Sequence, residues 1–286
     1  MSPASTESAI KPYGPFAIGS PRKPLCIDLF CGLGGWAEGF LAEGFECIGF
    51  DIERHDYGAG GYPGQLVLQD VLTLHGSQFR NAACIVASPP CQAYSYRAMP
   101  WKRAKALPPP SNALFEACFR IQREACETCR RCGHSRFSHD RQYGCSIDGC
   151  ECERAECRYI PMVVENVKGA QPWVGRAKWH YGSYYLWGDV PTLMPITMRT
   201  VKVDGFNFHQ HEKGLPGGSF QSAAVAAMDG TKHGGDWFSG YGGGFGWDHS
   251  QMRQHSSKSP ARKAASAMIA KIPFELSRHI AAIYKP

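Results

Sequence analysis

The sequence predicts an α/β fold built on a doubly wound, mostly parallel sheet. Short apolar runs rich in strand-forming residues alternate with segments of helical spacing, which is the pattern of βαβ units. A glycine-rich turn, "CGLGG", follows the first run directly, and later runs end at acidic or cysteine residues. The 286 residues, 43% of them apolar, suffice for one substantial core and a small second lobe.

The predicted strands can be placed in order along the chain. They cover 24–30, 46–53, 65–72, 81–90, 161–169 and 183–190. Residues 36–45 have helical spacing, because Trp36, Phe40 and Leu41 can share one face. Helical periodicity returns in 258–284, with a kink or break expected at Pro273.

Two stretches interrupt this alternation and set the expected boundaries. Residues 126–157 are rich in cysteine, and residues 196–250 are rich in glycine, histidine and aromatic side chains. We therefore expect four parts, which are a disordered tail at 1–23, a core at 24–195 carrying the Cys-rich insert, an irregular region at 196–250, and a helical segment at 251–286 that returns to the core.

Composition narrows the setting and the partners. The chain has no run of about 18 apolar residues and no apolar secretion segment, which predicts a cytoplasmic protein with no membrane partner and with reduced cysteines. The net charge is +6, and no acidic residue occurs between Asp70 and Glu116. That gap holds basic residues that favour an anionic substrate, although a solvated loop is the alternative; they are Arg80, Arg97, Lys102, Arg103 and Lys105, with Trp101 among them.

The glycine turn has the spacing of a nucleotide-binding loop. Gly32-x-Gly34-x-x-Ala37 is followed by Asp51, which lies 19 residues after Gly32. Small residues let the backbone approach a ligand, and an acid at the end of the second strand can accept hydrogen bonds from ribose hydroxyls. The pattern predicts an adenosine-containing cofactor, either NAD or S-adenosylmethionine, with a turn that binds no ligand as the alternative. Asp70 is a second candidate, for an adenine amino group.

A cysteine stands where the fourth predicted strand ends. Cys91 follows two prolines, whose restricted φ makes the corner stiff. Ligands of doubly wound sheets bind at the carboxyl ends of the strands, so this corner could hold a nucleophile still. A reactive thiol needs nearby positive charge or a helix N-terminus. The alternative is a buried apolar cysteine, which is the expectation for Cys26, Cys47 and Cys84.

Glu165 and Asn166, in "VVENVKG", end a later strand. A thiol and a carboxyl group at neighbouring strand ends, with S-adenosylmethionine, suit methylation at carbon 5 of cytosine. A thiolate that bonds to carbon 6, with hydrogen bonding or protonation at nitrogen 3, makes carbon 5 nucleophilic enough to accept a methyl group.

These segments together resemble a known family. "DLFCGLGGW", "GFDIE", "QDVL", "SPPCQAYS" and "ENVKG" resemble the ordered motifs of the DNA cytosine-5 methyltransferases, and "AMIAKIPFELSRHIA" resembles their last motif. The resemblance implies the S-adenosylmethionine-dependent methyltransferase (Rossmann-like) type of fold, with 24–195 as catalytic core and 196–250 as target-recognition region. It implies duplex DNA as partner, a flipped-out base, a monomer, and a loop at 92–110 that closes over DNA.

The resemblance also assigns roles to residues. It implies Cys91 as the nucleophile and Glu165 at nitrogen 3, with Asn166 and Pro90 beside them. Around S-adenosylmethionine it implies Phe30, Gly32, Leu33, Gly35, Asp51, Ile52, Asp70, Val71 and Pro89. The family's Gln-x-Arg-x-Arg motif is not reproduced in "GRAKWHYGSYYLWG", where Arg176, Lys178 or His180 could substitute. The short chain with an insert resembles enzymes of bacterial viruses, which implies a bacterial or phage-infected host cell.

The Cys-rich insert has the spacing of a metal site. It holds nine cysteines and histidines, which include the closely spaced pairs Cys129/Cys132 and Cys150/Cys152, and structural zinc is the expected cofactor. The predicted ligands are Cys129, Cys132, Cys150 and Cys152, with His134, His139 and Cys145 as alternatives or as members of a second site. Disulfides are the competing interpretation. Because the insert falls between the Cys91 and Glu165 strands, we expect it near DNA, with contacts through Arg130, Arg131, Arg136 and Arg141.

Two further functions compete with methyl transfer. The glycine pattern with Asp51 also fits a nicotinamide-dependent oxidoreductase with a zinc site, although that function would leave Cys91 and Glu165 unexplained. A non-catalytic DNA-binding protein on a methyltransferase scaffold would account for the missing arginine motif.

Overall fold

The computed structural model describes residues 23–56, 60–97, 102–140, 143–194, 267 and 270–286. The predicted tail (apart from Lys23), the whole of the predicted target-recognition region 196–250, and residues 251–266 lie outside this part of the chain. Among the described residues, no helix is both long and apolar enough to cross a membrane.

The core is a seven-stranded sheet whose order is β3-β2-β1-β4-β7-β9-β8. Its strands are β1 (Leu25–Leu29), β2 (Glu46–Asp51), β3 (Gln65–Leu68), β4 (Cys84–Ala87), β7 (Met162–Asn166), β8 (Trp179–Tyr181) and β9 (Tyr184–Gly188). The first five in sequence pair in parallel, and β9 is antiparallel to both β7 and β8. This confirms the predicted doubly wound, mostly parallel sheet.

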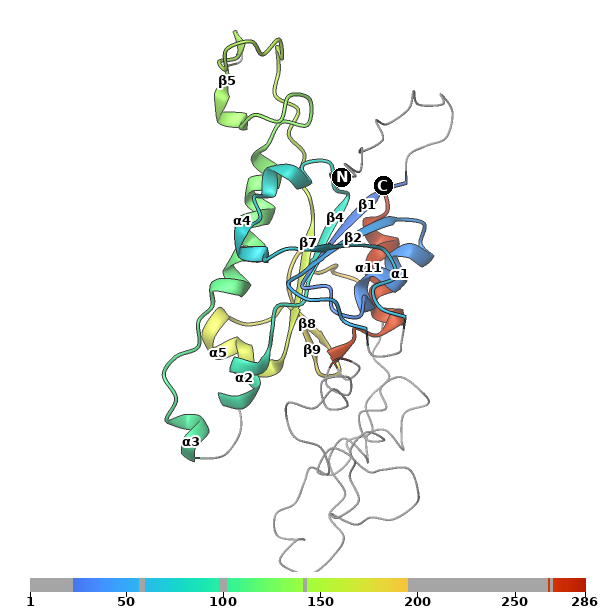
Figure 1. The fold of residues 1–286 in the computed structure, drawn as a ribbon, viewed down its shortest axis with the longest axis vertical. Coiled ribbons are helices and arrows are strands. Elements are labelled where there is room, and N and C mark those ends of the chain that lie inside the picture. Colours follow the sequence, from blue (N-terminus) through green and yellow to red (C-terminus); the bar gives the residue numbers. More distant parts are fainter. Residues whose placement is uncertain (1–22, 57–59, 98–101, 141–142, 195–266, 268–269) are drawn as a thin grey trace, which may run out of the picture.

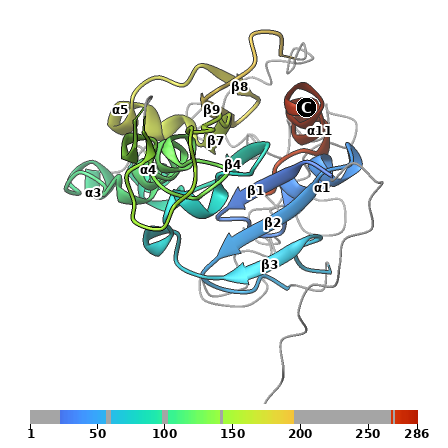
Figure 2. The ribbon, with the colours of Figure 1, turned by 90° about the horizontal axis from the view of Figure 1, so that it is seen from above.

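Helices cover both faces of this sheet, which explains why its central strands are buried and mostly apolar. All residues of β4 and β7 are buried. Helices α1 (Gly35–Ala42) and α11 (Phe274–Tyr284) lie on one face, and α4 (Ala113–Glu127) lies on the other (Figures 1 and 2). The buried strand β1 also carries an acid, and burial raises the pKa of Asp28, so this carboxyl group enters the core in its protonated form.

Helix α11 packs directly against α1 because α1 offers glycines at the contact. A Cβ atom on Gly39 would lie 2.3 Å from the backbone nitrogen of Arg278, and one on Gly35 would lie 2.5 Å from that of Ile272. The Ser277 hydroxyl donates to the Trp36 carbonyl in the same interface. The break expected at Pro273 is present, since α11 begins at the next residue.

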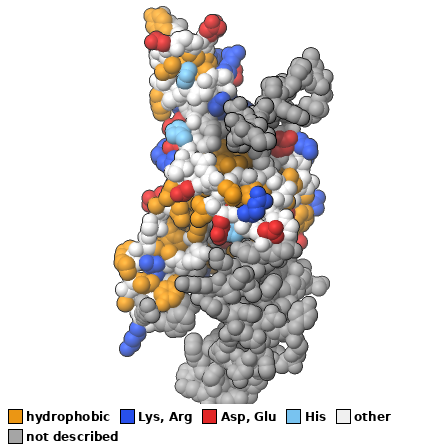
Figure 3. Space-filling model, in the orientation of Figure 1, with side chains coloured by type: hydrophobic (Ala, Val, Ile, Leu, Met, Phe, Trp, Pro, Cys, Tyr) orange, Lys and Arg blue, Asp and Glu red, His pale blue; other side chains and the backbone are white. Residues whose placement is uncertain are grey.

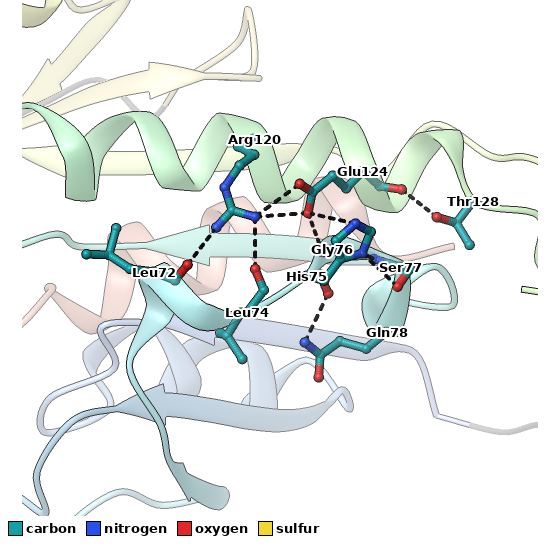
Figure 4. A network of polar contacts seen from close by, with 9 residues as sticks. All are labelled: Leu72, Leu74, His75, Gly76, Ser77, Gln78, Arg120, Glu124 and Thr128. Atoms are coloured by element: carbon teal, nitrogen blue, oxygen red, sulfur yellow. Dashed lines mark hydrogen bonds and ion pairs between the residues drawn. The ribbon is translucent and has the colours of Figure 1, made fainter. Parts of the chain in front are cut away.

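On the opposite face, α4 is anchored to the connection between β3 and β4. That connection contains two short helices, η1 (Val71–Thr73) and η2 (Gly76–Phe79). Arg120 donates to the carbonyl oxygen of Leu74 at 2.9 Å and pairs with Glu124, whose carboxylate accepts from the Gly76 nitrogen at 2.7 Å (Figure 4). Burial would raise the pKa of Glu124, but these donors outweigh burial and lower it.

The Cys-rich insert lies at the end of the sheet opposite to the end expected from the sequence. Parallel strands β4 and β7 point the same way, so α4 carries the chain from the carboxyl end of β4 back to the amino end of β7. The insert follows α4 and therefore lies at the amino end, where Figure 1 shows β5 beyond the top of α4. The expectation that it lies near the catalytic face was wrong, because it ignored this crossover helix.

The α1–α11 contact predicts an unusual result for Gly39→Ala. In an exposed helix interior this change stabilises by about 1 kcal/mol, whereas here the added methyl group meets the α11 backbone. We expect the free energy of unfolding to fall by about 1–3 kcal/mol in denaturant titrations. Ala282→Gly, on the exposed side of α11, reports helix propensity alone. A Gly39→Ala protein more stable than wild type would contradict the close packing.

Candidate active site

The glycine turn after β1 is held in an unusual backbone conformation. Phe30 has φ of 58°, and it is the one non-glycine residue with positive φ in the described part of the chain. Gly32 and Gly34 also have positive φ, of 50° and 76°. Strain of this kind costs about 1–3 kcal/mol and tends to occur at functional sites. A Cβ atom on Gly32 would meet no heavy atom within 4 Å, so the backbone of the turn is open to a ligand there.

Asp51 braces this turn from the end of β2. One carboxylate oxygen accepts from the Gly32 nitrogen at 2.9 Å, and the other accepts from the Ile52 nitrogen at 2.8 Å. The Oδ1 atom also accepts from the Glu53 nitrogen at 3.4 Å and lies 3.5 Å from the His55 ring, so the Oδ2 atom, which accepts from Gly32, is the oxygen with a lone pair for a ligand hydroxyl. Beside it, the Ile52 side chain is 72% exposed, so an apolar surface lies next to the carboxylate and the open glycine.

The other residues expected around the cofactor are placed less uniformly. Asp70 is exposed and accepts from the Leu72 nitrogen at 2.9 Å. Leu33, Val71 and Pro89 are buried, and Gly35 is in contact with Ile272. Leu33, Val71 and Pro89 therefore support the site from behind. Ile52 is exposed, whereas the Asp51 side chain is only 12% exposed.

Cys91 lies at a corner that is fixed on both sides. Before it, Ser88 donates its backbone N–H to Leu29 and accepts from the Trp36 ring nitrogen at 3.0 Å. After it, the Cys91 carbonyl accepts from the nitrogens of Tyr94 and Ser95 at the start of α2 (Gln92–Arg97). Pro90, between these anchors, is exposed. The thiol thus follows the carboxyl end of β4 on a rigid backbone.

The cysteines near the turn differ in burial. Cys91 is half-buried, whereas Cys26, Cys47 and Cys84 are buried, as the sequence predicted. Cys31, in the glycine turn, is also buried. Burial raises the pKa of Cys31 and Cys84, which keeps these thiols protonated.

Asn166 links the Cys91 corner to the strand that carries Glu165. Its amide nitrogen donates to the Pro89 carbonyl at 2.9 Å, and its amide oxygen accepts from the Val167 nitrogen at 2.9 Å. Asn166 is 1% exposed and Glu165 is 8% exposed. Since β4 and β7 are neighbours, this bond holds the thiol corner and the carboxyl group at adjoining strand ends.

The basic residues of the acid-free gap do not form one group. Arg80 lies beside Gly133 of the insert, at the amino end of the sheet. Arg97 donates to the carbonyls of Ala93 and Pro108, which folds the loop after α2 back on itself. Lys102 is exposed on α3 (Lys102–Lys105). Trp101 lies outside the described residues, as do the side chains of Arg103 and Lys105.

The three residues considered as substitutes for the missing arginine motif are all exposed. Arg176, Lys178 and His180 alternate along the approach to β8 and along β8 itself. The His180 ring stacks on Tyr185 with centroids 4.9 Å apart, and Tyr185 pairs with Asn166 in the sheet. His180 is therefore two strands away from Asn166 in the same row.

The insert brings seven cysteine and histidine side chains into two groups. The first is Cys129, Cys132, His139 and Cys152, and the second is Cys132, His134, Cys145 and Cys150. The four predicted ligands are thus divided, with Cys150 in the second group and Cys132 in both. Burial would raise the pKa of Cys129, but backbone donors including Cys132 and Glu156 outweigh it and lower the pKa to about 6. Acidic and basic side chains are interspersed over the insert (Figure 3).

Residues 25–125, from β1 to the last turn of α4, match the family model of the C-5 cytosine-specific DNA methylases. The matched segment contains the glycine turn, Asp51 and the Cys91 corner. No curated protein matches the chain.

Solved structures resemble part of the chain at low identity. One is described as a DNA modification methyltransferase encoded within an E. coli prophage, with 21% identity, 54% of this chain and 35% of that chain covered, and a TM-score of 0.31. For the Entamoeba histolytica methyltransferase EhMeth the values are 13%, 54%, 41% and 0.32, and for the S. pombe Dnmt2 methyltransferase they are 14%, 52%, 36% and 0.28. The chain thus spans less than half the length of each.

The hydrogen bonds of Asn166 predict a local stability effect where β4 and β7 end. Asn166→Ala leaves the Pro89 carbonyl and the Val167 N–H without their buried partners, so the free energy of unfolding should fall by about 1–3 kcal/mol. Asn112→Ala is the matched control, because Asn112 also bridges two segments, Tyr94 and Trp173, but in a more exposed position. Equal losses in the two variants would show that the Asn166 bond has no special structural role.

Proposed function

We propose that this protein methylates carbon 5 of cytosine in duplex DNA, with S-adenosylmethionine as the methyl donor. The observation that carries the proposal is the Asn166–Pro89 hydrogen bond, which brings the Cys91 corner and Glu165 to adjoining strand ends. The family match over residues 25–125 supports the same reaction class.

The residues at the glycine turn fit S-adenosylmethionine. Gly32 leaves open space beside the backbone, the Oδ2 atom of Asp51 has a lone pair for a ribose hydroxyl, and the exposed Ile52 can pack against a purine ring. Phe30 and Asp70 would complete this side, with Asp70 toward the adenine amino group. When bound there, S-adenosylmethionine supplies the methyl group for carbon 5.

The chain's own residues prepare the cytosine. The Cys91 thiolate forms a bond to carbon 6, and Glu165 hydrogen-bonds or protonates nitrogen 3, so electron density moves to carbon 5. After carbon 5 has gained the methyl group, a base removes its proton and the bond between Cys91 and carbon 6 breaks, which restores the thiolate. Asn166 acts as a positioning residue, because it holds the corner that carries Cys91. Duplex DNA must present the base flipped out of the helix.

Two observations favour this function over nicotinamide-dependent oxidation. The common dinucleotide-binding fold has six parallel strands in the order 3-2-1-4-5-6. Here the first five strands keep that order, but the next strand, β9, is antiparallel. An oxidoreductase would also leave the Cys91 corner and Glu165 without a role.

The presence of both the Cys91 thiol and the Glu165 carboxyl group also weighs against a DNA-binding protein without catalytic activity. Cys91 stays half-buried while neighbouring cysteines are buried, and Glu165 is kept at the sheet end despite the cost of placing a carboxyl group there. Recognition of the target sequence would fall to 196–250, with Arg176, Lys178 and His180 as contacts for phosphate.

Methyl transfer is tested with duplex DNA and a labelled donor, followed by analysis of the cytosine. Cys91→Ser should abolish label in 5-methylcytosine, and Glu165→Gln should slow its appearance by about 10²–10⁴-fold. Cys126→Ser is the control, because Cys126 lies at the end of α4 away from the site. Label transfer that survives Cys91→Ser would exclude the mechanism, and turnover of NADH would favour the oxidoreductase.

Cofactor binding isolates the role of Asp51. Asp51→Ala removes the acceptor for the Gly32 and Ile52 N–H groups as well as the ribose ligand, so affinity for S-adenosylmethionine should fall by about 10–100-fold in calorimetric titration. Asp148→Ala, in the insert, should bind as wild type does. Unchanged affinity in Asp51→Ala would place the cofactor elsewhere.

A further inference from the structure

The insert cannot be held together by an apolar core. Among the described residues between the end of α4 and the start of β7, the regular elements are η3 (Arg136–Ser138) and the two-residue strands β5 (His139–Asp140) and β6 (Gly144–Cys145). Its large apolar side chains point outward, with Phe137 75% exposed and Tyr143 81% exposed. Its order must come from the cysteine and histidine side chains that face one another.

The first group has the dimensions of a tetrahedral zinc site. The sulfurs of Cys129 and Cys152 are 3.9 Å apart, and the Cys132 sulfur is 3.3 Å from the Nε2 atom of His139. Zinc–sulfur bonds of about 2.3 Å and zinc–nitrogen bonds of about 2.0–2.1 Å give tetrahedral edges of about 3.8 Å and 3.5 Å. The observed separations match these edges, whereas a disulfide needs about 2.05 Å between sulfurs.

The second group repeats this arrangement beside the first. The Cys145 sulfur lies 3.3 Å from the Nδ1 atom of His134, and all four ligand atoms of the group lie within 4.8 Å of one another. The hairpin brings the groups together, because His139 of the first group pairs with Cys145 of the second across β5 and β6. The Cys132 sulfur belongs to both groups.

We propose that the insert binds two zinc ions, each held by three cysteines and one histidine, with the Cys132 sulfur bridging them. Seven residues then supply eight ligand positions, because Cys132 is counted in both groups. Cysteine and histidine ligands in tetrahedral arrangement select zinc over the hard divalent cations. This proposal does not depend on methyl transfer.

Contacts outside the two groups orient their members. The Nδ1 atom of His139 lies 3.0 Å from the Ser135 carbonyl, so it can donate there while Nε2 faces Cys132. The Glu156 backbone nitrogen donates to the Cys129 sulfur at 3.3 Å. The two remaining cysteines of this region, Cys126 and Cys157, contact backbone groups and belong to neither group.

The number of ions is measured by elemental analysis of the purified full-length protein. Wild type should hold two zinc ions per chain. Cys145→Ser should hold one, because only the second group loses a ligand, and Cys129→Ser should likewise hold one. Cys157→Ser is the matched control and should keep two. One zinc ion or none in the wild-type protein would overturn the proposal.

A count of zinc ions does not show whether the Cys132 sulfur bridges them, so the bridge is tested by a separate measurement. With cobalt(II) in place of zinc, two ions that share a thiolate are magnetically coupled, so the wild-type protein should show a weakened electron paramagnetic resonance signal per ion. Cys145→Ser, with one ion, should recover the full signal per ion. Two uncoupled ions in the wild type would exclude the bridge. These measurements use neither DNA nor a methyl donor, so they can fail while methyl transfer holds.

Discussion

The site depends on one buried amide. Asn166 donates to the carbonyl of Pro89 and accepts from Val167, so a single side chain fixes the ends of two neighbouring strands relative to each other. Pro89 and Pro90 cannot donate hydrogen bonds themselves, and the corner they form therefore needs an external donor. Because Cys91 follows this corner and Glu165 precedes Asn166, the same bond sets the relation between a thiol and a carboxyl group.

The doubly wound topology separates the Cys91 corner from the cysteine and histidine groups of the insert. The parallel strands end at the carboxyl end of the sheet, where the glycine turn, Asp51 and Cys91 lie. Each crossover connection returns the chain to the amino end of the sheet. Helix α4 makes the crossover between β4 and β7, and its anchoring through Arg120 and Glu124 fixes the point from which the insert extends. The cysteine and histidine groups of the insert and the corner that carries Cys91, although close in the sequence, lie at opposite ends of the sheet.

The strands of the sheet could be predicted from local sequence patterns. The six predicted strands are all present, with shorter bounds, because apolar runs that stop at glycine, proline or acidic residues report buried parallel strands directly. Helix α4 was not predicted, although Phe115, Cys118 and Ile121 recur at helical spacing. Because this crossover helix was missing from the prediction, the insert was expected at the wrong end of the sheet. The two Cys/His groups could not be separated from spacing alone, because their members alternate along the chain and only the hairpin sorts them.

The proposed methyl transfer depends on a covalent bond between the sulfur of Cys91 and a pyrimidine ring. Duplex DNA that carries 5-fluorocytosine at the target position cannot lose its substituent from carbon 5, so the enzyme should stay attached after methyl transfer. Proteolysis and mass spectrometry of the complex should locate the modified nucleotide on Cys91. Attachment at another cysteine would contradict the account. So would recovery of free protein and unmodified DNA from the fluorinated duplex under conditions in which the natural duplex is methylated.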